Sequence, residues 1–197
     1  MSSSALPTRS SFAALVLAAA LPAPAAPDAA AGRQKSEACA ACHGPAGNST
    51  NPAVPSLAAQ PPLYIVYQLI QFREGRRVNA QMSPFAAKLT DDNMKDIAAY
   101  FSAQVPAAAL RTPPPAQVED GQRVAARNHC GQCHTPTYAG QQHVPRLAAQ
   151  HYDYLVKELR GFKSGARPDI DGSMASAAQP LSEKDIVDVA AYLAGLK

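Results

Sequence analysis

The four cysteines of this chain form two copies of one short motif, and this feature constrains the chain more than any other. Each motif has the form C-x-x-C-H, running from Cys39 to His43 and, 91 residues later, from Cys130 to His134. In a helix, side chains three positions apart lie on the same face. Each motif therefore offers two thiols and an adjoining imidazole to a single group.

The similarity between the two parts of the chain extends beyond these motifs. V-P-S-L-A-A-Q at 54–60 matches V-P-R-L-A-A-Q at 144–150, and A-A-Y at 98–100 matches A-A-Y at 190–192. The offset changes only from 90 to 92 residues, which small loop insertions explain. The pattern predicts a duplicated domain of about 80 to 90 residues rather than a solenoid of many short repeats.

The composition favours helical domains and excludes several classes of protein. Hydrophobic residues make up 47% of the chain, but aromatic residues only 6%, with no tryptophan, which argues against a β-sandwich or barrel. The net charge of +3 shows no basic stripe of the kind that binds nucleic acid. The apolar content is too high for a disordered chain.

Helix boundary signals occur at equivalent places in the two halves. Thr90 and Ser182 are predicted N-caps, and Asp185 occupies the capping-box position after Ser182. A middle helix is expected to begin near Pro62, and its counterpart to span about 152–162. We therefore predict an all-α fold.

The chain divides into a leader, two domains and a linker. Residues 27–105 and 118–197 are the predicted domains. The linker at 106–117 contains three consecutive prolines, which favour an extended spacer.

Residues 1–26 have the pattern of a cleaved secretory signal peptide. Arg9 precedes an apolar run at 12–21, and a segment rich in small residues follows. The run is shorter than the roughly 20 apolar residues that span a bilayer. We therefore expect an exported, periplasmic protein that does not span the membrane, although association with a membrane surface remains open.

C-x-x-C-H is the attachment signature of c-type haem. The two thiols bond to the porphyrin, and the histidine supplies an axial nitrogen to the iron. This predicts two covalently bound haem c groups, held by Cys39, Cys42 and His43 and by Cys130, Cys133 and His134. The alternatives are a zinc site, two disulfides or a thioredoxin-like pair. Zinc fits poorly because 87 residues separate the two cysteine pairs, whereas about 15 to 20 are usual.

Methionines at equivalent positions are the predicted second axial ligands. Met82 follows His43 by 39 residues and Met174 follows His134 by 40, both in segments expected to be irregular. Met94 is instead expected in the core, because its counterpart is Ile186. Methionine opposite histidine fills the iron's coordination sphere, which favours electron transfer over small-molecule chemistry.

The remaining histidines are weaker candidates. His129 is too close to its motif to reach the opposite face of the same haem. His143 and His151 correspond to Ala53 and Pro61, so the first half has no equivalent. We expect these two histidines at the surface or near a propionate edge.

With its duplicated motifs, its export signal and the tails from Met82 to Phe101 and from Met174 to Tyr192, the chain resembles the di-haem cytochromes of the cytochrome c-4 family. The resemblance implies two tandem class I cytochrome c domains with haem propionates near the domain interface. It also implies an electron carrier rather than an enzyme. Its partners would be a quinol-oxidising cytochrome complex upstream and a terminal oxidase downstream in a respiratory chain.

The resemblance also suggests roles for residues around each haem. The carbonyls of Pro55 and Pro145 would accept the ring N–H of the ligand histidines and fix their orientation. The other residues that the resemblance implicates would wall the haem or reach a propionate: Leu57 and Leu147 for the wall, Tyr64 and Tyr154 for the propionates.

Two alternative functions remain. The chain also resembles di-haem subunits of larger oxidoreductases, such as flavin-dependent sulfide dehydrogenases. A peroxidase would instead need one haem with an open coordination position.

The methionine segments of the two halves differ, since Pro84 follows Met82 by two residues where Ser176 follows Met174. The two haems therefore need not share a reduction potential.

Overall fold

The computed structural model describes residues 26–197, so the predicted signal peptide lies almost wholly outside the described residues. The N-terminal half contains α1 (Ala29–Lys35), α2 (Glu37–His43), the 3-10 helix η1 (Pro45–Gly47), α3 (Pro62–Arg73), α4 (Met82–Ala86) and α5 (Asp91–Ser102). The C-terminal half contains α6 (Pro115–Arg127), α7 (Cys130–His134), α8 (Tyr152–Ser164), α9 (Ser173–Ala178) and α10 (Glu183–Gly195). The β-structure of the described range is a single isolated bridge between Gln141 and Val144.

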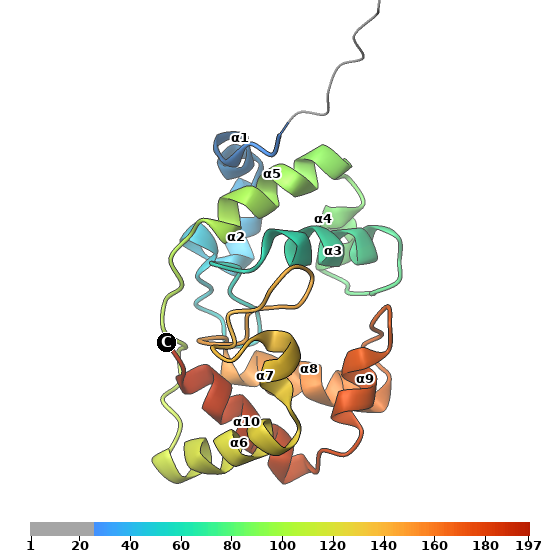
Figure 1. Ribbon diagram of the computed structural model, residues 1–197. Coiled ribbons are helices and arrows are strands. Elements are labelled where there is room, and N and C mark those ends of the chain that lie inside the picture. Colours follow the sequence, from blue (N-terminus) through green and yellow to red (C-terminus); the bar gives the residue numbers. More distant parts are fainter. Residues whose placement is uncertain (1–25) are drawn as a thin grey trace, which may run out of the picture.

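The helices form two domains of matching architecture, as Figure 1 shows with one domain above the other. In the first, α5 packs on α1 and α3; in the second, α10 packs on α6 and α8. The prediction of an all-α fold built from a duplicated domain is confirmed.

A glycine allows close contact between the first and last helices of each domain. A Cβ atom on Gly32 of α1 would lie 1.9 Å from the carbonyl oxygen of Asp96 in α5, and one on Gly121 of α6 would lie 2.0 Å from that of Asp188 in α10. No side chain fits at such a distance, so only glycine permits this approach of two backbones. The duplication has preserved this helix crossing.

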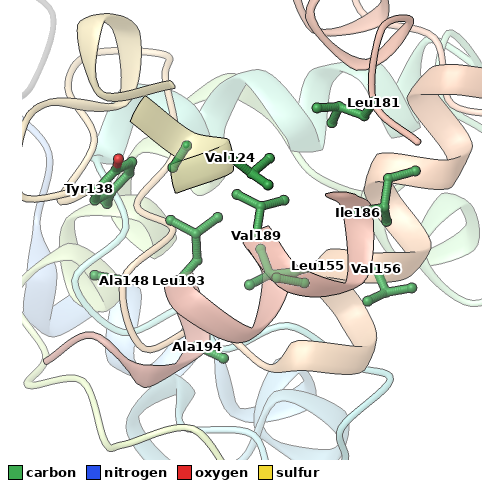
Figure 2. Packing of buried hydrophobic residues seen from close by; sticks show 12 residues of the cluster. Val124, Tyr138, Ala148, Leu155, Val156, Leu181, Ile186, Val189, Leu193 and Ala194 are labelled. Carbon is green, nitrogen blue, oxygen red and sulfur yellow. The ribbon is translucent and has the colours of Figure 1, made fainter. Parts of the chain in front are cut away.

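Each domain has its own hydrophobic core. In the first, α3 and α5 supply Ile65, Leu69, Met94, Ile97, Ala98 and Phe101. In the second, Val189 and Leu193 of α10 pack with Val124 of α6 and with Leu155 of α8 (Figure 2). Met94 is fully buried, which confirms its expected place in the core.

The predicted helix caps are confirmed. The Thr90 hydroxyl accepts a hydrogen bond from the Asn93 backbone N–H. Ser182 forms a complete capping box with Asp185. At the predicted linker the structure differs, because α6 begins at Pro115 rather than after 117. A proline is favoured in the first turn of a helix, so the third proline of the run starts this one.

The two domains are joined by reciprocal hydrogen bonds from two equivalent glutamines. Gln150 accepts from the Ser56 backbone N–H at 2.9 Å and donates to the Ser56 carbonyl at 2.9 Å. Gln60 does the same for Arg146, at 3.0 and 2.9 Å. Both glutamines are buried. Each domain therefore satisfies backbone groups of the other, in a pattern with pseudo-twofold symmetry.

Candidate haem sites

The cysteines lie on two short helices at the same place in each domain. Cys39 and Cys42 belong to α2, and Cys130 and Cys133 to α7. All four are free thiols. Cys42 and Cys133 are exposed, whereas Cys39 and Cys130 are partly buried, and burial raises the pKa of these two thiols. Each helix therefore presents one accessible and one sheltered sulfur.

The histidine of each motif is buried at the end of its helix and held by a proline carbonyl. Nδ1 of His43 donates to the carbonyl oxygen of Pro55 at 2.8 Å, and Nδ1 of His134 donates to that of Pro145 at 2.9 Å. Burial lowers the pKa of both imidazoles, which favours the neutral form. A neutral ring that carries its proton on Nδ1 has a free lone pair on Nε2, which is what an iron atom requires.

The two methionines predicted as iron ligands lie on short helices. The sequence predicted irregular segments, but Met82 begins α4 and Met174 lies in α9. The N-cap residues themselves, Gln81 and Gly172, make no side-chain capping bond, but a side chain further upstream accepts a hydrogen bond from the first turn and so caps each helix. The carboxamide oxygen of Asn79 accepts from the Met82 backbone N–H at 2.9 Å, and a carboxylate oxygen of Asp169 accepts from that of Met174 at 2.6 Å.

The leucines that the resemblance assigned to the haem wall are partly buried. Leu57 packs against the N-terminal core and Leu147 against the C-terminal core. Each follows its proline by two residues, so the wall residue and the histidine's acceptor come from the same loop.

The domain interface contains two buried polar atoms without a hydrogen-bond partner among the described residues. They are Nε of Arg146 and Nδ1 of His151. Nε2 of His151 donates to the Ser49 carbonyl at 2.9 Å, across the interface. A haem propionate is an anion that would satisfy a buried guanidinium N–H. The donor set and these unpartnered atoms therefore fit a haem in each domain.

The two histidines set aside from the sequence differ in environment. His143 is exposed and lies against Tyr67 of the other domain, with ring centroids 5.8 Å apart. His151 is only 2% exposed. The alternative of a surface position is thus wrong for His151, because the domain interface covers it.

An ion-pair cluster in the interface was missed by the sequence analysis. Glu158 of α8 binds Arg167 of its own domain at 2.6 Å and Arg77 of the other domain at 3.0 Å. Arg77 also donates to the Tyr154 hydroxyl at 3.4 Å, and burial raises the pKa of this phenol to about 12. Tyr154, one of the two tyrosines expected near a propionate, therefore lies among arginines. The repeat could have pointed to this cluster, because Arg77 and Arg167 stand at equivalent positions, 90 residues apart.

The fold and the two sites together define a two-domain c-type cytochrome. The profile of the family described as Cytochrome c matches residues 118–197, and that of "Cytochrome C oxidase, cbb3-type, subunit III" matches residues 25–101.

Relatives over the whole length give the particular family. Cytochrome c4 of Thiocapsa roseopersicina is 40% identical over 184 residues, which cover 88% of this chain and 95% of that protein. The crystal structure of reduced recombinant cytochrome c4 from Pseudomonas stutzeri superimposes with a TM-score of 0.81 at 33% identity, covering 87% of this chain and all of the other. The chain belongs to the cytochrome c4 family.

A third similarity concerns part of a larger protein. Thiosulfate dehydrogenase from Marichromatium purpuratum matches with a TM-score of 0.76 at 29% identity, over 85% of this chain but only 40% of that one.

Family membership establishes the general function. The chain is an electron-transfer protein of the cytochrome c4 type, with a haem c group at each C-x-x-C-H motif and methionine ligation in both domains. Among residues 26–197, no helix is both long enough and apolar enough to cross a bilayer.

Proposed function

We propose that this protein is a periplasmic electron carrier that passes electrons from a quinol-oxidising cytochrome complex to a terminal oxidase. The observation that carries the proposal is the equivalence of the two sites. In both domains a buried histidine is held by a proline carbonyl, and a methionine lies on a capped turn. Two haems with filled coordination spheres suit electron transfer and leave no position for a substrate.

Each residue of the site has a defined task in this proposal. The haem supplies one-electron chemistry, and the protein supplies attachment, orientation and electrostatics. The cysteines would hold the porphyrin covalently. His43 and His134 would offer Nε2 to the iron because their Nδ1 atoms are held by Pro55 and Pro145. Met82 and Met174 would each supply a thioether sulfur as the other protein ligand.

The charge of the chain indicates how it would meet its partners. The net charge of +3 includes Arg9, within the predicted signal peptide. Without this leader the charge is spread almost evenly, because each half carries about one positive charge at neutral pH. We therefore expect brief encounters through a small interface, with a weak dependence of the rate on salt.

A second candidate function is that of a dedicated subunit in a larger oxidoreductase. The similarity to thiosulfate dehydrogenase from Marichromatium purpuratum favours it, since a domain pair of this shape forms part of that longer chain. The flavin-dependent sulfide dehydrogenases that the sequence suggested are a further example of this class.

The decisive experiment uses the full chain matured with haem in a bacterial periplasm. Intact mass should show two haems and a cleaved leader. The reduced protein should then be oxidised rapidly by membranes containing a terminal oxidase, and the oxidised protein reduced by a quinol-oxidising complex. Constant co-elution with a flavoprotein or dehydrogenase in gel filtration would favour the subunit instead. Rapid cyanide binding at either haem would contradict methionine ligation there.

A further inference from the structure

The helices that carry the two methionines are capped by different chemical groups. Asn79 caps α4, with its carboxamide oxygen 2.9 Å from the Met82 backbone nitrogen. Asp169 caps α9, with one carboxylate oxygen 2.6 Å from the Met174 nitrogen and 3.4 Å from that of Ala175. Asn79 lies three residues before Met82 and Asp169 five before Met174, because the offset of the repeat changes from 90 to 92 in this segment, but both hold the methionine's backbone N–H. The two caps have nearly the same shape but differ by one negative charge.

A second carboxylate strengthens this difference. Asp171 accepts a hydrogen bond from the Ser173 backbone N–H at 3.0 Å, as Asn79 accepts one from the Gln81 backbone N–H in the first domain. Hydrogen bonding to this backbone N–H lowers the pKa of Asp171 and so keeps it ionised. The segment before Met174 therefore carries two negative charges where the segment before Met82 carries none.

These two carboxylates have no direct ion-pair partner among the described residues. Among the described residues, the ion pairs within 4.0 Å involve neither Asp169 nor Asp171. Both acids reach into their surroundings: burial raises the pKa of Tyr67 in the other domain, the charges of Asp171 and, less strongly, Asp169 raise it further, and Arg76 opposes them with an effect between the two. Glu158, the other acid that replaces an amide near the interface, differs in having two arginine partners.

We propose that Asp169, assisted by Asp171, sets the reduction potential of the C-terminal haem. This proposal rests on the proposed function, since it takes Met174 as the ligand of that iron. A negative charge near the iron stabilises its ferric state, which has the greater positive charge, and so lowers the potential relative to an amide cap.

The charge difference would bias electron transfer within the molecule. When one electron leaves the C-terminal haem, which passes from ferrous to ferric, and enters the N-terminal haem, which passes from ferric to ferrous, the negative charge near the first haem favours the transfer. Asp169 makes this transfer more favourable than it would be between two amide-capped sites. Asp169 is thus a tuning residue, whose charge acts on the haem while its carboxylate holds the Met174 backbone N–H.

The test exchanges the two caps in the full-length protein with both haems bound. Asn79 shows that an amide caps this turn, so D169N should keep the helix while removing the charge. We expect D169N to raise one midpoint potential in a spectroelectrochemical titration. The equilibrium between the two half-reduced forms should shift about tenfold, or about 59 mV for one electron. The reverse exchange, N79D, should lower the other potential by a similar amount.

Two controls separate the local charge from other effects. D153N removes a charge from an exposed position on α8 and should leave both potentials unchanged. The D169N shift should shrink only modestly as ionic strength rises, because Asp169 is partly buried and salt screens such a charge less than an exposed one. The charge-transfer band of the iron–methionine bond should persist in D169N.

Each outcome has a distinct meaning. If D169N keeps the iron–methionine band but neither potential moves, Asp169 does not tune the haem, while the carrier function stands. If D169N loses the band, the role of Asp169 is structural and the proposal is overturned. If the wild-type protein lacks the band at the C-terminal haem, methionine ligation fails there, and the proposed function fails together with this inference.

Discussion

The N-terminal and C-terminal domains hold their backbones with the same residues and have nearly the same net charge, but they place charged side chains at different positions. The helix-crossing glycines and the interface glutamines occur in both. Acids in the second domain, however, stand where the first has amides. Gln68 corresponds to Glu158 and Asn93 to Asp185, and Asn79, which holds the backbone before Met82, has two acidic counterparts before Met174, Asp169 and Asp171. Since an acid and its amide have nearly the same shape and both accept hydrogen bonds, charge can differ between the domains while the fold remains the same.

The largest loss of stability is expected at the glycine helix crossing, which both domains share. G121A would place a Cβ 2.0 Å from the Asp188 carbonyl oxygen and force α6 away from α10. We expect a loss of about 3 kcal/mol in the free energy of unfolding, measured by denaturant titration of the haem-loaded protein. The matched control is G195A in the same helix pair, where the nearest atom, on Val118, lies 3.8 Å away. Equal stabilities for the two variants would contradict the proposed close crossing.

The next effect concerns Glu158, the acid that binds one arginine from each domain. E158Q makes the second domain resemble the first and leaves two partly buried arginines without a counter-ion. We expect a loss of about 2 kcal/mol in the free energy of unfolding. The exposed neighbour K157Q should change it by less than about 0.5 kcal/mol. A fully stable E158Q variant would show that the ion-pair cluster contributes nothing to domain association.

The interface glutamines should respond as an equivalent pair. Q150A removes the partner of both Ser56 backbone groups, and Q60A does the same for Arg146. Each should lower the free energy of unfolding by about 1 to 2 kcal/mol, because buried polar groups are left unsatisfied. Hydrogen exchange should accelerate at the Ser56 amide in Q150A but not in the exposed α1 variant Q34A. Unchanged exchange at that amide would argue against these interdomain bonds in solution.

The smallest effect tests the difference between the helix caps. Asp185 completes the capping box of α10, while the corresponding Asn93 does not do so for α5. D185N should cost about 1 kcal/mol in the free energy of unfolding at neutral pH, measured by thermal unfolding.

This last difference should depend on pH. Hydrogen bonds from Ser182 lower the pKa of Asp185 below its ordinary value of 3.8. Its contribution is therefore complete above about pH 3.8 and is lost as the pH falls through the lower value in the folded protein. The stability gap between wild type and D185N should close in acid. A gap of constant size would mean that the charge of Asp185 is not involved.

Sequence alone predicted the features that depend on local pattern. The C-x-x-C-H motifs, the caps at Thr90 and Ser182 and the core position of Met94 follow from spacing and from comparison of the repeats. The short helix at Met82 was not predicted, because its first turn depends on the side chain of Asn79. The burial of His151 was missed because contacts between domains depend on how the domains are oriented, which helical periodicity does not encode.

The reciprocal glutamine bonds also join the two iron ligands mechanically. Ser56 directly follows Pro55, whose carbonyl holds His43, and Arg146 directly follows Pro145, whose carbonyl holds His134. Each peptide that fixes an imidazole is therefore clamped by the opposite domain. Rotation of one histidine ring would disturb a peptide that a glutamine of the other domain holds, so the orientations of the two rings are coupled. Separation of the two domains would break these bonds and loosen the hold on His43 and His134 at the same time.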